Sequence, residues 1–150
     1  MKKRVIIVLS VLAFFIILFL VAVFINFPLK KAKKLDLTED IIMTIKQDTL
    51  TRTSATILLT NNSDVSYSTG RGYRIDTFKD GKWYTLSLLE DMIVTADALG
   101  IDPDNPLELT LYWERSYGEL ENGQYRIVKS VFTDDRPLKD KDVIVEFTIK

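Results

Sequence analysis

The apolar residues of this chain follow two different patterns, and the change lies near residue 40. Residues 5–27 are 23 consecutive positions of which only Ser10 and Asn26 are polar and none is charged. A helix of this length measures roughly 34 Å, which is enough to cross a hydrocarbon core of about 30 Å. We therefore predict a transmembrane helix over residues 5–27, with the lipid bilayer as its partner.

Basic residues flank the apolar run on both sides, so their count alone leaves its orientation open. They are Lys2, Lys3 and Arg4 before the run and Lys30, Lys31, Lys33 and Lys34 after it. Long domains are translocated largely regardless of charge, which favours a cytoplasmic arm (residues 1–4) and a C-terminal domain outside the cell. The run is longer than a signal peptide core and ends in bulky residues, which favours a retained signal anchor over a cleaved signal peptide.

From Ile41 onward the apolar positions recur with period two, which is typical of strands with one buried face. This alternation covers residues 41–46, 54–61, 107–113, 125–133 and 143–150. Asp80-Gly81 lies between two segments rich in β-formers, 73–78 and 83–86, and predicts a tight hairpin. About seven short strands without a long amphipathic helix predict an all-β fold, either a two-sheet sandwich or a barrel.

Two segments have no strand pattern. Residues 28–40 are basic and then polar, and we predict a stalk whose lysines contact lipid headgroups, with a specific lipid or wall-polymer site as the less favoured alternative. The stretch from Asp91 to Gly100 favours a short helical turn. The loop Asp102–Asn105 has clustered oxygen ligands, but it lacks the spacing of an EF-hand, which favours a turn over a calcium site.

Charge and missing residue types exclude several classes of function. From Asp36 onward the chain has 13 basic and 21 acidic residues, a net charge of −8, which disfavours binding to nucleic acid. The sequence has no cysteine and no histidine, so disulfides, thiolate chemistry and any Ser-His-Asp mechanism are excluded. We predict no enzyme activity, no cofactor and no metal site.

One motif favours the sandwich over the barrel. Leu120-x-x-Gly123-x-Tyr125 has the spacing of a tyrosine corner, in which a tyrosine hydroxyl bonds to the backbone a few residues upstream and fixes the connection between two sheets. Trp83 or Trp113 is expected to cover this corner as an aromatic plug, and Trp113 is the favoured candidate.

Residues 41–150 also resemble a known family, the bacterial immunoglobulin-like domains of membrane-anchored surface proteins in Gram-positive bacteria. The matching stretches are Asn61-Asn62-Ser63-Asp64, Tyr67-Ser68-Thr69-Gly70, Asp80-Gly81-Lys82-Trp83-Tyr84, the segment from Trp113 to Lys129, and Val145-Glu146-Phe147. The resemblance implies an Ig-like antiparallel β-sandwich outside the membrane, without known catalytic residues and with an accessory role.

The leading functional hypothesis is a non-catalytic module that contacts a protein or cell-wall partner at the cell surface. The candidate contact segments are 61–71 and 88–105. Tyr67 and Tyr84, like Tyr73 and Tyr117, are candidate contact residues, although aromatic residues more often pack against their own sheet. A glycan hydrolase with a carboxylate pair is the first alternative. The candidate pairs are Glu119 with Glu121 and Asp102 with Asp104. A structural subunit of a membrane complex is the second alternative.

Overall fold

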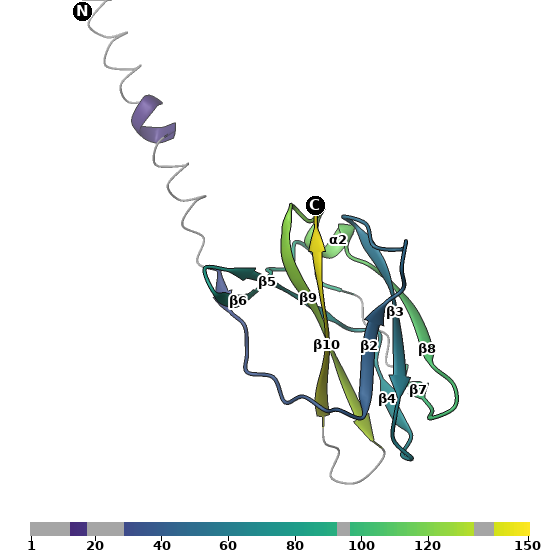
Figure 1. Cartoon of the computed structure of the whole chain (residues 1–150). Coiled ribbons are helices and arrows are strands. Elements are labelled where there is room, and N and C mark those ends of the chain that lie inside the picture. The colour runs from purple at the N-terminus through teal and green to yellow at the C-terminus, as the bar shows by residue number, and fades with distance from the viewer. Residues whose placement is uncertain (1–12, 18–28, 93–96, 134–139) are drawn as a thin grey trace, which may run out of the picture.

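Figure 1 shows the computed structural model, which describes residues 13–17, 29–92, 97–133 and 140–150. Two antiparallel sheets pack face to face. The smaller sheet contains β2 (Ile41–Ile45), β3 (Ser54–Asn61) and β8 (Leu107–Tyr112). The larger sheet contains β1 (Lys30–Lys31), β4 (Tyr67–Thr69), β5 (Arg74–Lys79), β6 (Lys82–Thr85), β7 (Leu99–Ile101), β9 (Gly123–Thr133) and β10 (Asp140–Ile149).

Strand β9 organises the larger sheet because it has neighbours along both edges. β10 pairs with one edge along its full length. The other edge is divided, since β5 pairs with residues 124–128 and β4 pairs with residues 131–133. β6 and then β1 extend the sheet beyond β5, while β7 extends it beyond β4. The chain between β4 and β5 therefore crosses a gap in the sheet beside residues 129–130.

The core lies between the two sheets. Most of its side chains are those that the alternating pattern predicted to face inward, and Ile75 and Ile101 join them from segments without a predicted alternation. The smaller sheet contributes Ile41, Met43, Ala55, Ile57, Leu59 and Leu111, and the larger sheet contributes Ile75, Ile101, Tyr125, Ile127, Val131, Val143, Phe147 and Ile149. Core residues alternate with more exposed positions along β2 and β8, whereas residues 125–129 of β9 are buried on both faces. The prediction of an all-β sandwich is confirmed.

The hairpin between β5 and β6 is also confirmed. Lys79 lies opposite Lys82, so the connection has two residues. Asp80 and Gly81 have φ angles of 50° and 73°, the pair of positive values that a type I′ turn requires. Figure 1 shows β5 and β6 on one side of the sandwich, with β3 and β8 on the opposite side.

Three local predictions differ from the structure. The described residues form ten strands where we expected about seven, and β1 and β7 are among the additions. Gly100 lies in the middle of β7 and does not end a helical turn, while residues 93–96 of that predicted turn lie outside the described residues. The short helix α2 (Glu114–Tyr117) follows β8 and was not predicted.

The predicted stalk is part of the sandwich where the structure describes it. Residues 30–31 form β1 on the edge of β6. Further along, the Asp142 N–H donates to the Asp36 carbonyl at 2.7 Å and the Thr38 N–H donates to the Asp142 carbonyl at 3.3 Å. Two short pairings thus attach residues 30–38 to the larger sheet. The sequence did not predict these pairings, because lysine and aspartate are uncommon in strands.

Most of the predicted transmembrane segment, residues 5–27, lies outside the described residues. Residues 13–17 are described and are helical. None of the helices in the described ranges is both long enough and apolar enough to span a bilayer.

Candidate binding surface

The predicted corner residues lie together at the start of β9. The Tyr125 hydroxyl donates to the Glu121 carbonyl at 2.9 Å. A Cβ atom on Gly123 would lie 3.4 Å from the Tyr125 ring, so the absent side chain lets the ring lie against the backbone. The Leu120 side chain is buried, and its N–H donates to the Arg52 carbonyl at 2.9 Å. These contacts tie the connection before β9 to the chain that precedes β3.

The two tryptophans occupy different faces of the protein. Trp113 is fully buried, its indole N–H donates to the Arg52 carbonyl at 2.8 Å, and its ring centroid lies 6.0 Å from that of Phe147. Phe147 in turn stacks on Tyr125, so Trp113 is the tryptophan at the corner. Trp83 lies on the outer face of the larger sheet, with its ring 4.5 Å from the Arg126 guanidinium.

The two tyrosines predicted to contact a partner have different environments. Tyr67 is 8% exposed and its hydroxyl donates to the Asp40 carboxylate. The prediction that Tyr67 contacts a partner is therefore wrong, because its ring is part of the core and its polar atom is bonded. Tyr84 is half-buried in β6, opposite Thr77 on one side and Lys31 on the other. A contact through Tyr84 stays a prediction.

The carboxylates considered for acid–base work lie on exposed turns. Asp102 accepts a hydrogen bond from the Ser66 hydroxyl at 3.2 Å, and its carbonyl accepts the Asn105 N–H at 3.3 Å. Glu119 lies 3.8 Å from Arg52 in a largely exposed ion pair. Within the described residues, no group of three or more acidic side chains is placed to hold a metal ion. The carboxylates of both candidate pairs are therefore exposed surface groups in turns.

A buried ion cluster lies on the outer face of the larger sheet and was missed by sequence reasoning. Asp76 is fully buried, although it alternates with the inward-facing Ile75. Its carboxylate accepts hydrogen bonds from Thr85 Oγ1, Arg74 Nε and Arg126 Nε, each at 2.9 Å. Thr85 and Arg126 are its direct neighbours on β6 and β9. The cluster therefore ties three strands together. Asp76 occupies a position that the alternation of β5 directs away from the core, so no sequence pattern indicated that it is buried.

A second buried charge fills the gap in the larger sheet. Lys129 is 1% exposed, and its amine donates to the carbonyls of Gly70 and Gly72 at 2.8 and 2.9 Å. Burial lowers the pKa of Lys129 to about 8. The lysine thus anchors the segment that crosses from β4 to β5. In the alternating pattern of β9, Lys129 occupies an inward-facing position between Ile127 and Val131. This position could have identified Lys129 as a buried lysine from the sequence.

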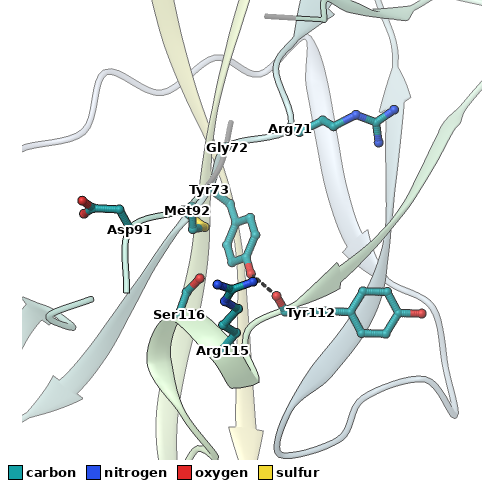
Figure 2. A pocket seen from close by; sticks show the side chains of 8 residues that line it. All are labelled: Arg71, Gly72, Tyr73, Asp91, Met92, Tyr112, Arg115 and Ser116. Carbon is teal, nitrogen blue, oxygen red and sulfur yellow. Dashed lines mark hydrogen bonds between the residues drawn. The ribbon is translucent and has the colours of Figure 1, made fainter. Parts of the chain in front are cut away.

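Figure 2 shows an open pocket of about 330 Å³ between the start of β5, the end of β8 and α2. The Tyr73 hydroxyl points across it and donates to the Tyr112 carbonyl at 2.8 Å. Burial, assisted by Tyr117, raises the pKa of Tyr73 to about 12, so this phenol is neutral at physiological pH. The Tyr112 ring points away from the pocket and is 75% exposed.

The two arginines that line this pocket are already in ion pairs. Arg115 Nε lies 2.5 Å from Glu90, and Arg71 Nε lies 3.1 Å from Asp97. The neighbouring Leu89 is 70% exposed. The pocket therefore combines exposed apolar and aromatic surface with neutralised ion pairs, which is the composition of a protein contact rather than of a catalytic site. It lies between two loops that the sequence pointed to, 61–71 and 88–105.

Comparison with known proteins identifies the family of the chain. A search of curated proteins finds none that matches this chain. The family model described as a bacterial Ig-like domain matches residues 38–148, which covers both sheets except β1 and the last residue of β10. Domains of this family are generally binding or structural modules without catalytic activity. With most of its length matched, the chain belongs to the bacterial Ig-like domain family.

Proposed function

We propose that this protein is a membrane-anchored, extracytoplasmic Ig-like module with a non-catalytic binding or accessory role at the cell surface. The observation that carries the proposal is the order of two segments. An uncharged apolar run of 23 residues stands directly before an Ig-like sandwich that begins with β1. A single anchor of this kind tethers the domain that follows it to one side of the membrane.

The pocket of Figure 2 is the surface that we assign to the partner, which is a protein or a cell-wall component. Two exposed side chains lie beside the pocket: the Tyr112 ring, which points away from it into solvent, and Leu89, whose N–H is bonded to the pocket residue Ser116. Exposed aromatic anchors typically contribute most to binding. The backbone beneath is fixed, since the Leu89 N–H donates to the Ser116 carbonyl at 2.7 Å and Tyr73 holds the end of β8. A preformed surface loses little conformational entropy on binding.

Protease treatment of intact cells that produce the full-length protein tests the topology. We expect added protease to digest the domain from outside while a cytoplasmic marker protein stays intact. Cleavage of the domain only after cell lysis would reverse the orientation and remove the proposal.

Alkaline extraction of membranes tests the anchor. Replacing Ile16 and Ile17 by lysine places two charges in the apolar run, at about 3 kcal/mol each, and should release the protein from membranes. Ala13→Leu is the matched control and should leave it membrane-bound. Release of the unchanged protein would show that residues 5–27 are not an integral anchor.

The absence of cysteine allows a direct test of the partner surface. A photoactivatable crosslinker is attached to a single cysteine at Tyr112→Cys, or at Thr44→Cys on the outer face of the smaller sheet as the control. We expect an adduct on cells from position 112 and not from position 44. Identical patterns from both positions would exclude the pocket as the contact.

A further inference from the structure

Six exposed lysines from two separate segments of the chain gather along one edge of the larger sheet. They are Lys30, Lys31, Lys33, Lys34, Lys79 and Lys82, and we call them the lysine edge. Four belong to β1 and the residues after it, and two lie at the ends of the β5–β6 turn. Figure 1 shows β5 and β6 at the corner of the sandwich where the described chain resumes after residues 18–28.

Backbone pairing brings the two groups of lysines together. Lys30 lies opposite Thr85 and Lys31 lies opposite Tyr84. The Ala32 N–H then donates to the Trp83 carbonyl at 3.0 Å, which continues the same ladder toward Lys82. Neighbouring strands are about 4.8 Å apart, so the lysines of both segments lie along the same edge of the sheet.

The charges of the lysine edge have no counter-ions within the described part of the chain. No hydrogen bond or ion pair to a described residue holds any of the six amines. Other lysines are paired: Lys46 binds Glu108 at 3.0 Å and Lys141 binds Asp36 at 2.8 Å. Lys79 lies directly opposite Lys82, and like charges in this position repel. An external anion would relieve that repulsion.

Apolar side chains accompany the lysines. Leu29 is 41% exposed just before β1, and Phe78 is 38% exposed beside Lys79. The Phe78 ring lies 5.0 Å from the half-buried Trp83 ring. Lysines interspersed with aromatic and aliphatic residues are typical of segments that lie at the boundary between headgroups and acyl chains.

We propose that the lysine edge docks on anionic lipid headgroups, so that β1 and the β5–β6 turn lie along the membrane surface. This inference rests on the proposed anchor. The apolar run ends at Phe27, and three residues of extended chain reach about 10 Å, so Lys30 lies within headgroup distance. Continuity with the anchor and charge complementarity both favour a bilayer over a soluble polyanion as the occupant.

Lysine acylation read by mass spectrometry tests the docking on the unaltered full-length protein. The protein is placed in vesicles of phosphatidylcholine alone or mixed with phosphatidylglycerol. We expect labelling of Lys79 and Lys82 to fall about fivefold or more in the anionic vesicles, because a lysine at an anionic surface gains roughly that factor in binding. Labelling of Lys46, on the other sheet, should not change. Equal labelling of Lys79 and Lys82 in both vesicles would overturn the proposal.

A pair of charge-reversal variants separates docking from general electrostatics. In Lys82→Glu the protection of Lys33 and Lys34 by anionic vesicles should weaken, whereas Lys46→Glu, with the same change in net charge, should leave it intact. Equal effects of both variants would mean that overall charge, and not the lysine edge, controls the contact.

The outcomes also distinguish this inference from the anchor itself. Failure of the protein to float with either type of vesicle would refute the anchor. Flotation with both types without selective protection would refute the docking alone. Protection of Lys79 and Lys82 by soluble polyglycerol phosphate, but not by anionic vesicles, would make a wall polymer the partner and overturn the lipid assignment.

Discussion

Lys129 offers the most direct test of the forces in this fold, because it is a buried cation whose hydrogen-bonded partners among the described residues are two backbone carbonyls. Its amine donates to Gly70 and Gly72 at 2.8 and 2.9 Å, and burial lowers the pKa of Lys129 from 10.5 to about 8. Lys129→Met keeps an unbranched apolar stem and removes the charge and both hydrogen bonds. The variant should change how the free energy of unfolding depends on pH.

The sign follows from proton binding in the two states. Between pH 8 and about 10 the unfolded lysine keeps a proton that the folded protein has released, so the stability of the wild type rises with pH. The slope is at most about 1.4 kcal/mol per pH unit, and the full pKa difference corresponds to about 3 kcal/mol. Above about pH 10 the trend reverses, because the raised pKa of Tyr73 keeps its phenol protonated only in the folded state.

Two opposing contributions set the effect of the substitution. Losing the hydrogen bonds leaves two carbonyls unpaired, at about 1–3 kcal/mol each. Removing the charge relieves a desolvation cost of about 3 kcal/mol at neutral pH. Near pH 7 these contributions nearly cancel. Near pH 10 only the lost hydrogen bonds remain, so Lys129→Met should be less stable than the wild type by about 2–6 kcal/mol.

Urea unfolding of the full-length protein in detergent, followed by tryptophan fluorescence, measures this difference because Trp113 is fully buried. The control is Lys46→Met, which removes an exposed amine paired with Glu108 and should retain the pH slope of the wild type. Parallel slopes for the wild type and Lys129→Met between about pH 8 and pH 10 would refute the reasoning.

Three further substitutions test other parts of the fold by the same unfolding assay. Tyr125→Phe removes the hydroxyl that donates to Glu121 and should cost about 0.5–1.5 kcal/mol, and an unchanged midpoint would mean that this bond adds nothing. Asp76→Asn leaves two arginines without their buried counter-charge and should cost about 3–5 kcal/mol, so a loss below about 1 kcal/mol would contradict the importance of the cluster. Gly81→Ala forces a Cβ onto a residue with φ of 73° and should cost about 1–2 kcal/mol. Gly100→Ala is its control, since the nearest atom to the added Cβ lies 3.8 Å away.

The architecture was predictable because the sandwich buries one face of each long strand. Ile41, Met43 and Ile45 face the core as their spacing required, and so do the alternating residues of β3, β8 and β10. The different burial of the two tryptophans also follows from the alternation of inward-facing and outward-facing positions along their strands. Trp113 continues the inward series of Leu109 and Leu111, whereas Trp83 is the outward neighbour of Phe78 across the hairpin.

The surface features were less predictable because they depend on pairing between distant segments. Asp76 is buried only because Arg126 and Thr85 meet it from two other strands, and no local pattern contains that register. The burial of Tyr67 has the same origin, since β4 is a three-residue strand that pairs with both β7 and β9. The strand β1 was missed because two lysines carry no strand signal of their own.

The lysine edge bears on the orientation that counting flanking charges left open. Lys30 and its neighbours would normally be counted as a topology signal that opposes the N-terminal basic arm. Lys79 and Lys82 lie far beyond the range of about 15–20 residues in which charges affect orientation, yet they share the same surface. Docking on the membrane explains why all six lysines lie along one edge, whereas a role in setting the orientation of the anchor applies only to the four that follow the apolar run. The chain from Asp36 onward has a net charge of −8, so an anionic membrane repels most of the domain. This repulsion would orient the acidic part of the domain away from the membrane and the lysine edge toward it.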